Sequence, residues 1–144
     1  MSSPPYRFLP HTTDAYIEAV GSTFEEALEN AAASLIDTMC DLRAVSPKTA
    51  EEIRVNAADE LTLVSEWLEA ILLKFEIEQK VYSDFQVKLL KLPEGGFRIN
   101  AVVRGERYDR RKHGAKVEVK AVTYHRMEIV RDGAATVVRF ILDL

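Results

Sequence analysis

The chain has 144 residues, of which 47% are hydrophobic and 29% charged, and its formal net charge is −4. This composition is ordinary for a globular protein, and the length suits one domain, predicted to span residues 1–144. No apolar run approaches the ~18 residues of a membrane span, and the net negative charge argues against a generic nucleic-acid-binding protein. The first residues lack the pattern of a signal peptide and Cys40 is the only cysteine, which together predict a cytoplasmic location.

The charge is unevenly distributed along the chain. Residues 1–60 hold 11 acidic and 4 basic residues, whereas the remainder holds 12 acidic and 15 basic ones. Most of the positive excess lies in residues 104–120. The sequence therefore has one basic neighbourhood within an acidic protein.

The first predicted elements are two strands and a helix. Tyr6–Leu9 is a short strand candidate that ends at Pro10, and residues 15–20 alternate between small or apolar and larger side chains. Thr23 and Glu26 have the spacing of a capping box, which predicts the start of a helix over about residues 23–41. Helical spacing of the apolar residues that follow supports this prediction.

The rest of the chain is predicted as a strand, a helix and four strands. Residues 52–57 alternate as in a strand with one buried face, and Asp59 is a candidate cap for a helix with a broad apolar stripe from Leu61 to Phe75. Glycine-containing turns at 93–96 and 132–133 predict hairpins between strands. The four strands are predicted at residues 84–92, 97–104, 123–130 and 134–142.

This order of elements predicts an α+β fold. Two helices cannot cover both faces of so many strands. The economical arrangement has two layers, a mixed, mostly antiparallel sheet with both helices packed on one face. The C-terminal strand is then expected inside the sheet, where it holds its last residues in fixed positions.

Several familiar enzyme classes are excluded by missing motifs. The sequence contains no glycine-rich phosphate loop, no Cys/His metal-binding spacing and no Gly-x-Ser-x-Gly turn. Trp67 and Cys40 fall among apolar helix positions and are predicted to be core residues, the latter an inert thiol. His125 is in phase with Met127 and Ile129, which predicts a partly buried histidine rather than a metal ligand.

Candidate metal ligands lie near both ends of the chain. Asp143 stands beside Leu144, whose carboxylate adds a second negative charge that a cation would offset. With Asp14 these groups form an oxygen-only set, which favours Ca²⁺ or Mg²⁺ over zinc. The alternative is that Asp14 only shapes a turn and Asp143 is an exposed strand end. The metal site requires the first and last strands to be neighbours.

Each of two basic features can be interpreted either as functional or as an ordinary solvent-exposed charge. Lys120 is either a solvated charge or a ligand for a phosphate, a partner's carboxylate or the tail carboxylates. Residues 104–114 combine five basic side chains with Tyr108, but also contain Glu106 and Asp109. This stretch is either an RNA-contacting loop or a solvated docking loop, and an electrostatic RNA contact would weaken with salt.

Taken in order, several segments resemble the archease family. The opening His11-Thr12-Thr13-Asp14 is similar to the family's His-Thr-Ala-Asp, with the aspartate retained. Further similar segments span nearly the whole chain, at residues 6–14, 21–27, 66–68, 105–106, 119–127 and 141–144.

The resemblance implies a non-enzymatic role in tRNA splicing. Archeases assist the RtcB-type RNA ligase by promoting guanylylation of the ligase and multiple turnover, and some are linked to a tRNA cytosine methyltransferase. The family associates a divalent cation, identified as calcium, with the positions of Asp14, Asp143 and Leu144; Mg²⁺ or Mn²⁺ is an alternative ion. Lys120 matches a functional lysine. A competing hypothesis is a metal-dependent phosphate hydrolase.

Overall fold

The computed structural model describes residues 5–9 and 14–144. The helices are α1 (Phe24–Met39), α2 (Glu60–Glu78) and the short α3 (Arg110–His113), with a 3₁₀ turn at Leu42–Ala44. The strands are β1 (Tyr6–Leu9), β2 (Ala15–Gly21), β3 (Thr49–Ala57), β4 (Lys80–Lys91), β5 (Phe97–Arg107), β6 (Ala121–Asp132) and β7 (Ala135–Asp143). None of the described helices is both long and apolar enough to traverse a membrane.

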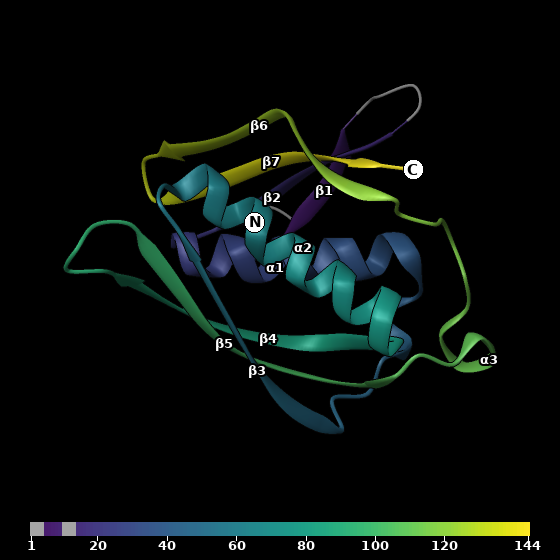
Figure 1. The fold of residues 1–144 in the computed structure, drawn as a ribbon. Helices are drawn as coiled ribbons and strands as arrows, with labels where there is room; N and C mark the ends of the chain where they lie inside the picture. The colour runs from purple at the N-terminus through teal and green to yellow at the C-terminus, as the bar shows by residue number, and fades with distance from the viewer. Residues whose placement is uncertain (1–4, 10–13) are drawn as a thin grey trace.

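The strands form two antiparallel sheets with the long helices between them. One sheet has four strands in the order β1-β2-β7-β6, and the other has three in the order β3-β5-β4. Both α1 and α2 contact strands of both sheets, so the molecule has three layers (Figure 1). The predicted α+β class is confirmed, but the arrangement of one sheet with two layers is wrong. A helix with a broad apolar stripe can be covered by a second sheet, which sequence spacing did not reveal.

Helix α1 begins as the capping box predicts. The Thr23 hydroxyl accepts a hydrogen bond from the Glu26 amide at 3.0 Å, and the Glu26 carboxylate accepts one from the Ser22 amide at 3.1 Å. These bonds satisfy amides that have no partner within the helix. The helix ends at Met39, and the capping residue Cys40 that follows has an extended backbone.

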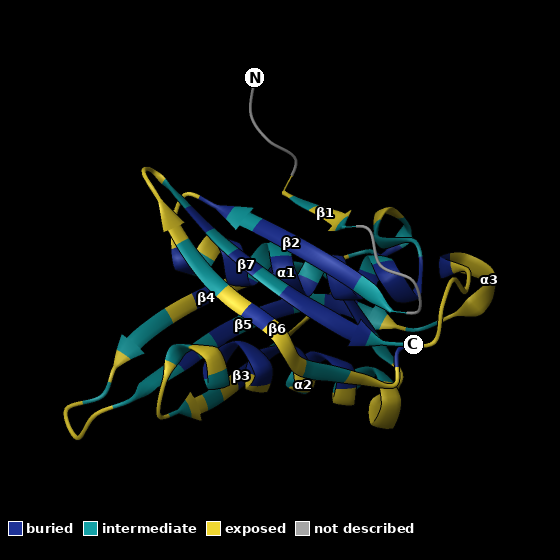
Figure 2. Cartoon of the chain, turned by 90° about the horizontal axis from the view of Figure 1, so that it is seen from above, coloured by how far each residue is buried: buried dark blue, intermediate teal, exposed yellow. Residues whose placement is uncertain are grey.

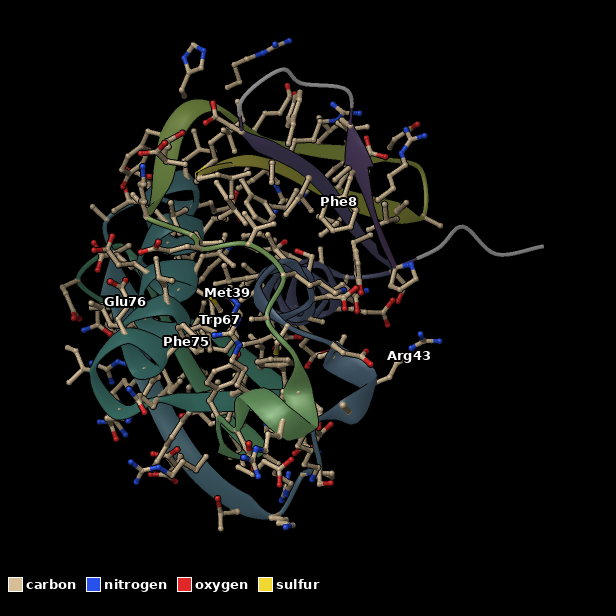
Figure 3. The ribbon with its side chains drawn as sticks, turned by 90° about the vertical axis from the view of Figure 1, so that its right-hand side faces the viewer. Phe8, Met39, Arg43, Trp67, Phe75 and Glu76 are labelled. Carbon is tan, nitrogen blue, oxygen red and sulfur yellow. The ribbon has the colours of Figure 1, made fainter. Side chains whose placement is uncertain are left out.

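The two sheets and both long helices share one core. Trp67 is fully buried and donates its indole N–H to the Leu28 carbonyl at 2.9 Å, which links α2 to α1. Met39, Trp67 and Phe75 lie in the interior in Figure 3, whereas Arg43 and Glu76 point outward. Cys40 is buried, as predicted for a core cysteine, and burial raises the pKa of its thiol to about 11, which disfavours the reactive thiolate.

Strand β7 lies between β2 and β6, as predicted for the C-terminal strand. It pairs antiparallel with β2 along its length, from Gly21 opposite Thr136 to Ala15 opposite Leu142. Figure 2 shows β2 and β7 as largely buried strands, with the more exposed β6 beside them. The pairing joins segments about 120 residues apart in the chain.

Strand β6 contains a wide irregularity that changes the direction of its side chains. Its register with β7 shifts between Thr123 and Glu128, and Arg126 within the shift has φ of 57°. His125 is exposed, so the prediction that it is partly buried is wrong. The extra residues break the strict alternation on which that prediction depended.

Candidate functional site

Strand pairing brings three distant segments of the chain to one end of the four-stranded sheet. Asp14 directly precedes Ala15, and Ala15 lies opposite Leu142 of β7. Asp143 follows Leu142 and lies opposite Ala121 of β6. The requirement that the strands near the two ends of the chain be neighbours is therefore met.

The backbone of Lys120 is bonded directly to this end of β7. Its amide donates to the Asp143 carbonyl at 2.7 Å, which places it one residue beyond the last pair of β6 and β7. Lys120 is exposed, whereas Asp14, Asp143 and Leu144 are half-buried. The structure thus places the backbones of all four residues predicted from the sequence at one end of the sheet.

Alternation along β7 shows which way Asp143 faces. Val138, Phe140 and Leu142 are buried in the core, so Arg139, Ile141 and Asp143 lie on the outer face of the sheet. An outward carboxylate at the end of a central strand is held by the sheet yet accessible to a ligand.

A cavity of about 370 Å³ opens beside these residues. Its described lining comes from β1, β2, α1, the segment before β6 and the C-terminal residue: Phe8, Leu9, Asp14, Ala15, Tyr16, Asp37, Thr38, Lys116, Val117 and Leu144. Phe8 and Val117 are about half exposed at its edge. The cavity therefore combines an apolar wall with carboxylates at one side.

Asp37 is the third acidic side chain near this site, and it already has partners. It accepts hydrogen bonds from the Tyr6 hydroxyl at 2.7 Å and from the Lys116 ammonium at 3.0 Å. Burial opposes ionisation of Asp37, but the hydrogen bonds from Tyr6, Lys116 and the Leu42 amide outweigh it and lower the pKa of the carboxyl. This carboxylate links β1 and the segment before β6 to α1.

The described residues provide some, but not all, of the ligands that a metal ion would need. Within residues 5–9 and 14–144, no group of three His, Cys, Asp or Glu side chains is placed to hold a metal ion. Asp14, Asp143 and the carboxylate of Leu144 are hard oxygen donors, which suits Ca²⁺ or Mg²⁺, but these cations take six to eight oxygens. The donor chemistry fits such an ion only if water or a partner supplies the remaining ligands.

The irregular part of β6 lies next to the candidate ligands. The Arg126 guanidinium lies 5.2 Å from the centre of the Tyr16 ring, a cation–π contact between β6 and β2. Tyr124 and His125 are exposed on the same segment. His11, Thr12 and Thr13, also part of the predicted site region, lie outside the described residues.

Comparison with known proteins identifies the family. The model of the Archease protein family (MTH1598/TM1083) matches residues 6–144. The chain belongs to the archease family. It is 40% identical over 140 residues to the archease of Methanopyrus kandleri, covering 97% of this chain and 99% of that protein. It is 41% identical over 119 residues to the archease of Thermococcus gammatolerans, covering 83% of each.

Solved structures of archeases have the same fold. The solution structure of protein 1598 from Methanobacterium thermoautotrophicum is 30% identical, with a TM-score of 0.82 and coverage of 97% of this chain and 99% of that one. The crystal structure of a Thermotoga maritima archease, described as a possible chaperone, is 19% identical with a TM-score of 0.63 and supports the fold alone. The resemblance to archeases seen in the sequence is confirmed.

Sequence reasoning missed two residues of this archease's site. Asp37 lies within a helix whose pattern reports only its buried face, and Lys116 is one of many cations in residues 104–120. No signal in the sequence pairs them, because their 3.0 Å ion pair joins positions 79 residues apart. Only the tertiary structure shows that they line the cavity.

Proposed function

We propose that this archease is a non-catalytic protein cofactor of an RtcB-type RNA ligase. It promotes guanylylation of the ligase and multiple turnover during tRNA splicing and RNA repair in the cytoplasm. The observation that carries this proposal is the meeting of Asp14, Asp143, Leu144 and Lys120 at one end of the four-stranded sheet. These positions match the family's functional ones, and membership of that family supports the role.

The arrangement suits the handling of a divalent cation and phosphates at a partner's active site. Asp14, Asp143 and the Leu144 carboxylate are the residues that would hold the cation, Ca²⁺ in the first instance, with Mg²⁺ or Mn²⁺ as alternatives. When bound, such an ion neutralises phosphate charge. An open ligand set is consistent with a site that is completed only when the ligase approaches.

The archease's own side chains would then position groups rather than react with them. Lys120 is exposed beside the carboxylates, where its ammonium can bind a nucleotide phosphate or orient the carboxylates. Positioning of this kind lowers a barrier by holding reactants in a productive geometry. The ligase would form the covalent guanylate, and the archease would form none.

The decisive experiment is single-turnover guanylylation of the cognate ligase with GTP and a divalent metal. We expect a large acceleration by the wild-type archease and loss of most of it with Asp14→Asn or Asp143→Asn, because an amide carries no negative charge for a cation. Asp132→Asn is the matched control: this exposed carboxylate lies at the opposite end of the β6–β7 hairpin. The control protein should accelerate guanylylation like the wild type.

Other outcomes would favour the remaining hypotheses. Full stimulation by a folded Asp14→Asn protein would refute the role of this carboxylate. No acceleration by the folded wild type would favour a modulator of a tRNA cytosine methyltransferase, and would leave the acidic cluster with a structural role. Phosphate release by the archease alone, lost in the same variants, would favour the hydrolase.

A further inference from the structure

A second cavity lies at the end of the three-stranded sheet. It has a volume of about 720 Å³, and nine residues from β3, β5, α3 and the loops beside them line it: Lys48, Thr49, Glu106, Arg107, Tyr108, Asp109, Arg110, Lys112 and His113. Four of these side chains are permanently cationic and two are acidic. This cavity lies apart from the candidate site at Asp14, Asp143 and Leu144, and it is not part of the hydrophobic core.

Glu106 fixes the base of this cavity. Its carboxylate accepts hydrogen bonds from the Ser46 amide at 2.9 Å, Lys112 at 2.6 Å and His113 at 2.7 Å, and Lys48 lies 3.4 Å away. Burial opposes its ionisation, but these partners outweigh burial and hold the pKa of Glu106 far below its usual range. The negative charge of Glu106 is therefore turned inward and compensated.

His113 locks α3 onto this base. Its side chain is fully buried and its Nδ1 accepts from the Asp109 amide at 2.9 Å, so the Nε2–H donates to Glu106. The Tyr108 ring stacks on the imidazole with 5.8 Å between ring centres, and the His113 carbonyl accepts from the Asp41 amide at 2.9 Å. His113 thus anchors α3, while residues 109–112 remain exposed, as expected of a solvated loop.

The outer side of this loop carries cations that the internal network does not use. Arg107, Arg110 and Arg111 are exposed, and within the described part of the chain none of them forms an ion pair. Asp109, which directly precedes Arg110, accepts from the Arg111 amide as the cap of α3. Lys48 is also mostly exposed despite its contact with Glu106. Lys48, Arg107 and Arg110 thus line one cavity, and Arg111 follows Arg110 on α3.

We propose that this surface, formed by Lys48, Arg107, Arg110 and Arg111, binds the phosphate backbone of single-stranded RNA. A guanidinium matches two phosphate oxygens at once, and its planar fork loses less entropy per hydrogen bond formed than a flexible ammonium does. The surface has no apolar anchor, since Tyr108 packs on His113 and Phe75, which makes a protein partner a poor match. The choice of RNA among polyanions rests on the proposed function.

The location of this surface suits an RNA strand held beside the acidic site. Figures 1 and 2 both place α3 and the C-terminus at the same end of the molecule. Residues 114–120 connect α3 to β6. Within them, Lys116 lines the cavity that Asp14 and Leu144 also line. An RNA bound at α3 would therefore lie at the end of the archease that faces the ligase.

The test is binding of a labelled single-stranded RNA to the archease alone, measured by fluorescence anisotropy at several salt concentrations. Four phosphate contacts predict a slope of log affinity against log salt near −3, or about 50-fold weaker binding at 200 mM than at 50 mM salt. The triple variant Arg107→Glu, Arg110→Glu, Arg111→Glu should bind at least about 10-fold more weakly and lose roughly 2 units of slope.

The matched control moves the same charge change to another surface. The triple variant Arg54→Glu, Lys88→Glu, Lys91→Glu alters three exposed residues of β3 and β4. It should retain most of the RNA affinity, and equal weakening by both triple variants would overturn the proposal. A second variant set, with glutamine at 107, 110 and 111, avoids new repulsion within the loop, and circular dichroism checks that each protein is folded.

The proposed activator function and the proposed RNA-binding surface can be refuted independently. Absence of RNA binding by an archease that stimulates guanylylation would overturn this inference alone. RNA binding that depends on the three arginines, in a protein that leaves the ligase unaffected, would support this surface and refute the activator role.

Discussion

Glu106 joins three parts of the chain at a single carboxylate. It belongs to β5, its partners come from the loop before β3 and from α3, and its side chain is only 9% exposed. A charged group in such a network stabilises the fold only while it is ionised. Its depressed pKa therefore links the stability of the α3 region to pH.

Replacing Glu106 should reveal how the stability of the protein depends on pH. Glu106→Gln is expected to lower the free energy of unfolding by about 1–3 kcal/mol at pH 7, because His113 and Lys112 lose a charged acceptor. The folded pKa lies below the unfolded value of about 4.3, so the stabilisation is present above that pH and declines below it. Urea unfolding from pH 7 to pH 3 should show the gap between wild type and variant narrowing toward acid.

Glu94→Gln serves as the control for this comparison, because Glu94 is exposed in the turn between β4 and β5. Its variant should match the wild type across the same range. A gap for Glu106→Gln that stays constant with pH would show that the carboxylate acts by packing and not by charge.

At the scale of elements, α1 protects an edge of the three-stranded sheet. The Glu25 and Glu29 carboxylates accept hydrogen bonds from the Leu89 and Val87 amides of β4, each at 2.8 Å. Unpaired amides on an edge strand otherwise invite pairing with another chain. Burial raises the pKa of Glu29, because it disfavours the charged form of the carboxyl.

Two substitutions at Glu29 should separate charge from hydrogen bonding. Glu29→Ala leaves the Val87 amide without its acceptor and should cost about 1–3 kcal/mol, whereas Glu29→Gln keeps an acceptor oxygen and should change stability by less than about 0.5 kcal/mol. Thermal and urea unfolding measure both. If both variants lose the same stability, the negative charge is what matters and this interpretation fails.

The sequence predicted elements whose signals are local. Thr23 and Glu26 are adjacent on one turn of helix, and Gly133 sits in a hairpin turn where φ is 60°. The candidate site at Asp14 and Asp143 was also predicted, from the carboxylates near both ends of the chain and from the resemblance to archeases. The second sheet, the exposed His125 and the buried His113 were not, because each depends on contacts that spacing within one segment does not encode.

At the scale of the whole molecule, both sheets enclose the same core. Phe140 of β7 and Ile99 of β5 are both fully buried members of one cluster, although they belong to different sheets. Trp67 of α2 is buried in this core, so its fluorescence is sensitive to unfolding of the core. The prediction of a single domain over residues 1–144 can be tested on that basis.

A single domain should unfold in one transition. Trp67 fluorescence and far-ultraviolet circular dichroism should give the same urea midpoint. Phe140→Ala should lower both midpoints together, at a cost of about 3–5 kcal/mol, because it removes a large buried ring. Two separated transitions, with only one moved by Phe140→Ala, would mean that the sheets are independent units.

The place of β7 between β2 and β6 has a consequence for synthesis on the ribosome. Residues 15–21 can pair with residues 6–9 early, but their second partner strand, residues 135–143, is made much later, so the four-stranded sheet is completed late. The acidic residues at its end meet only at that moment. A chain truncated before residue 135 would lack β7, and with it the assembled site and the proposed activity.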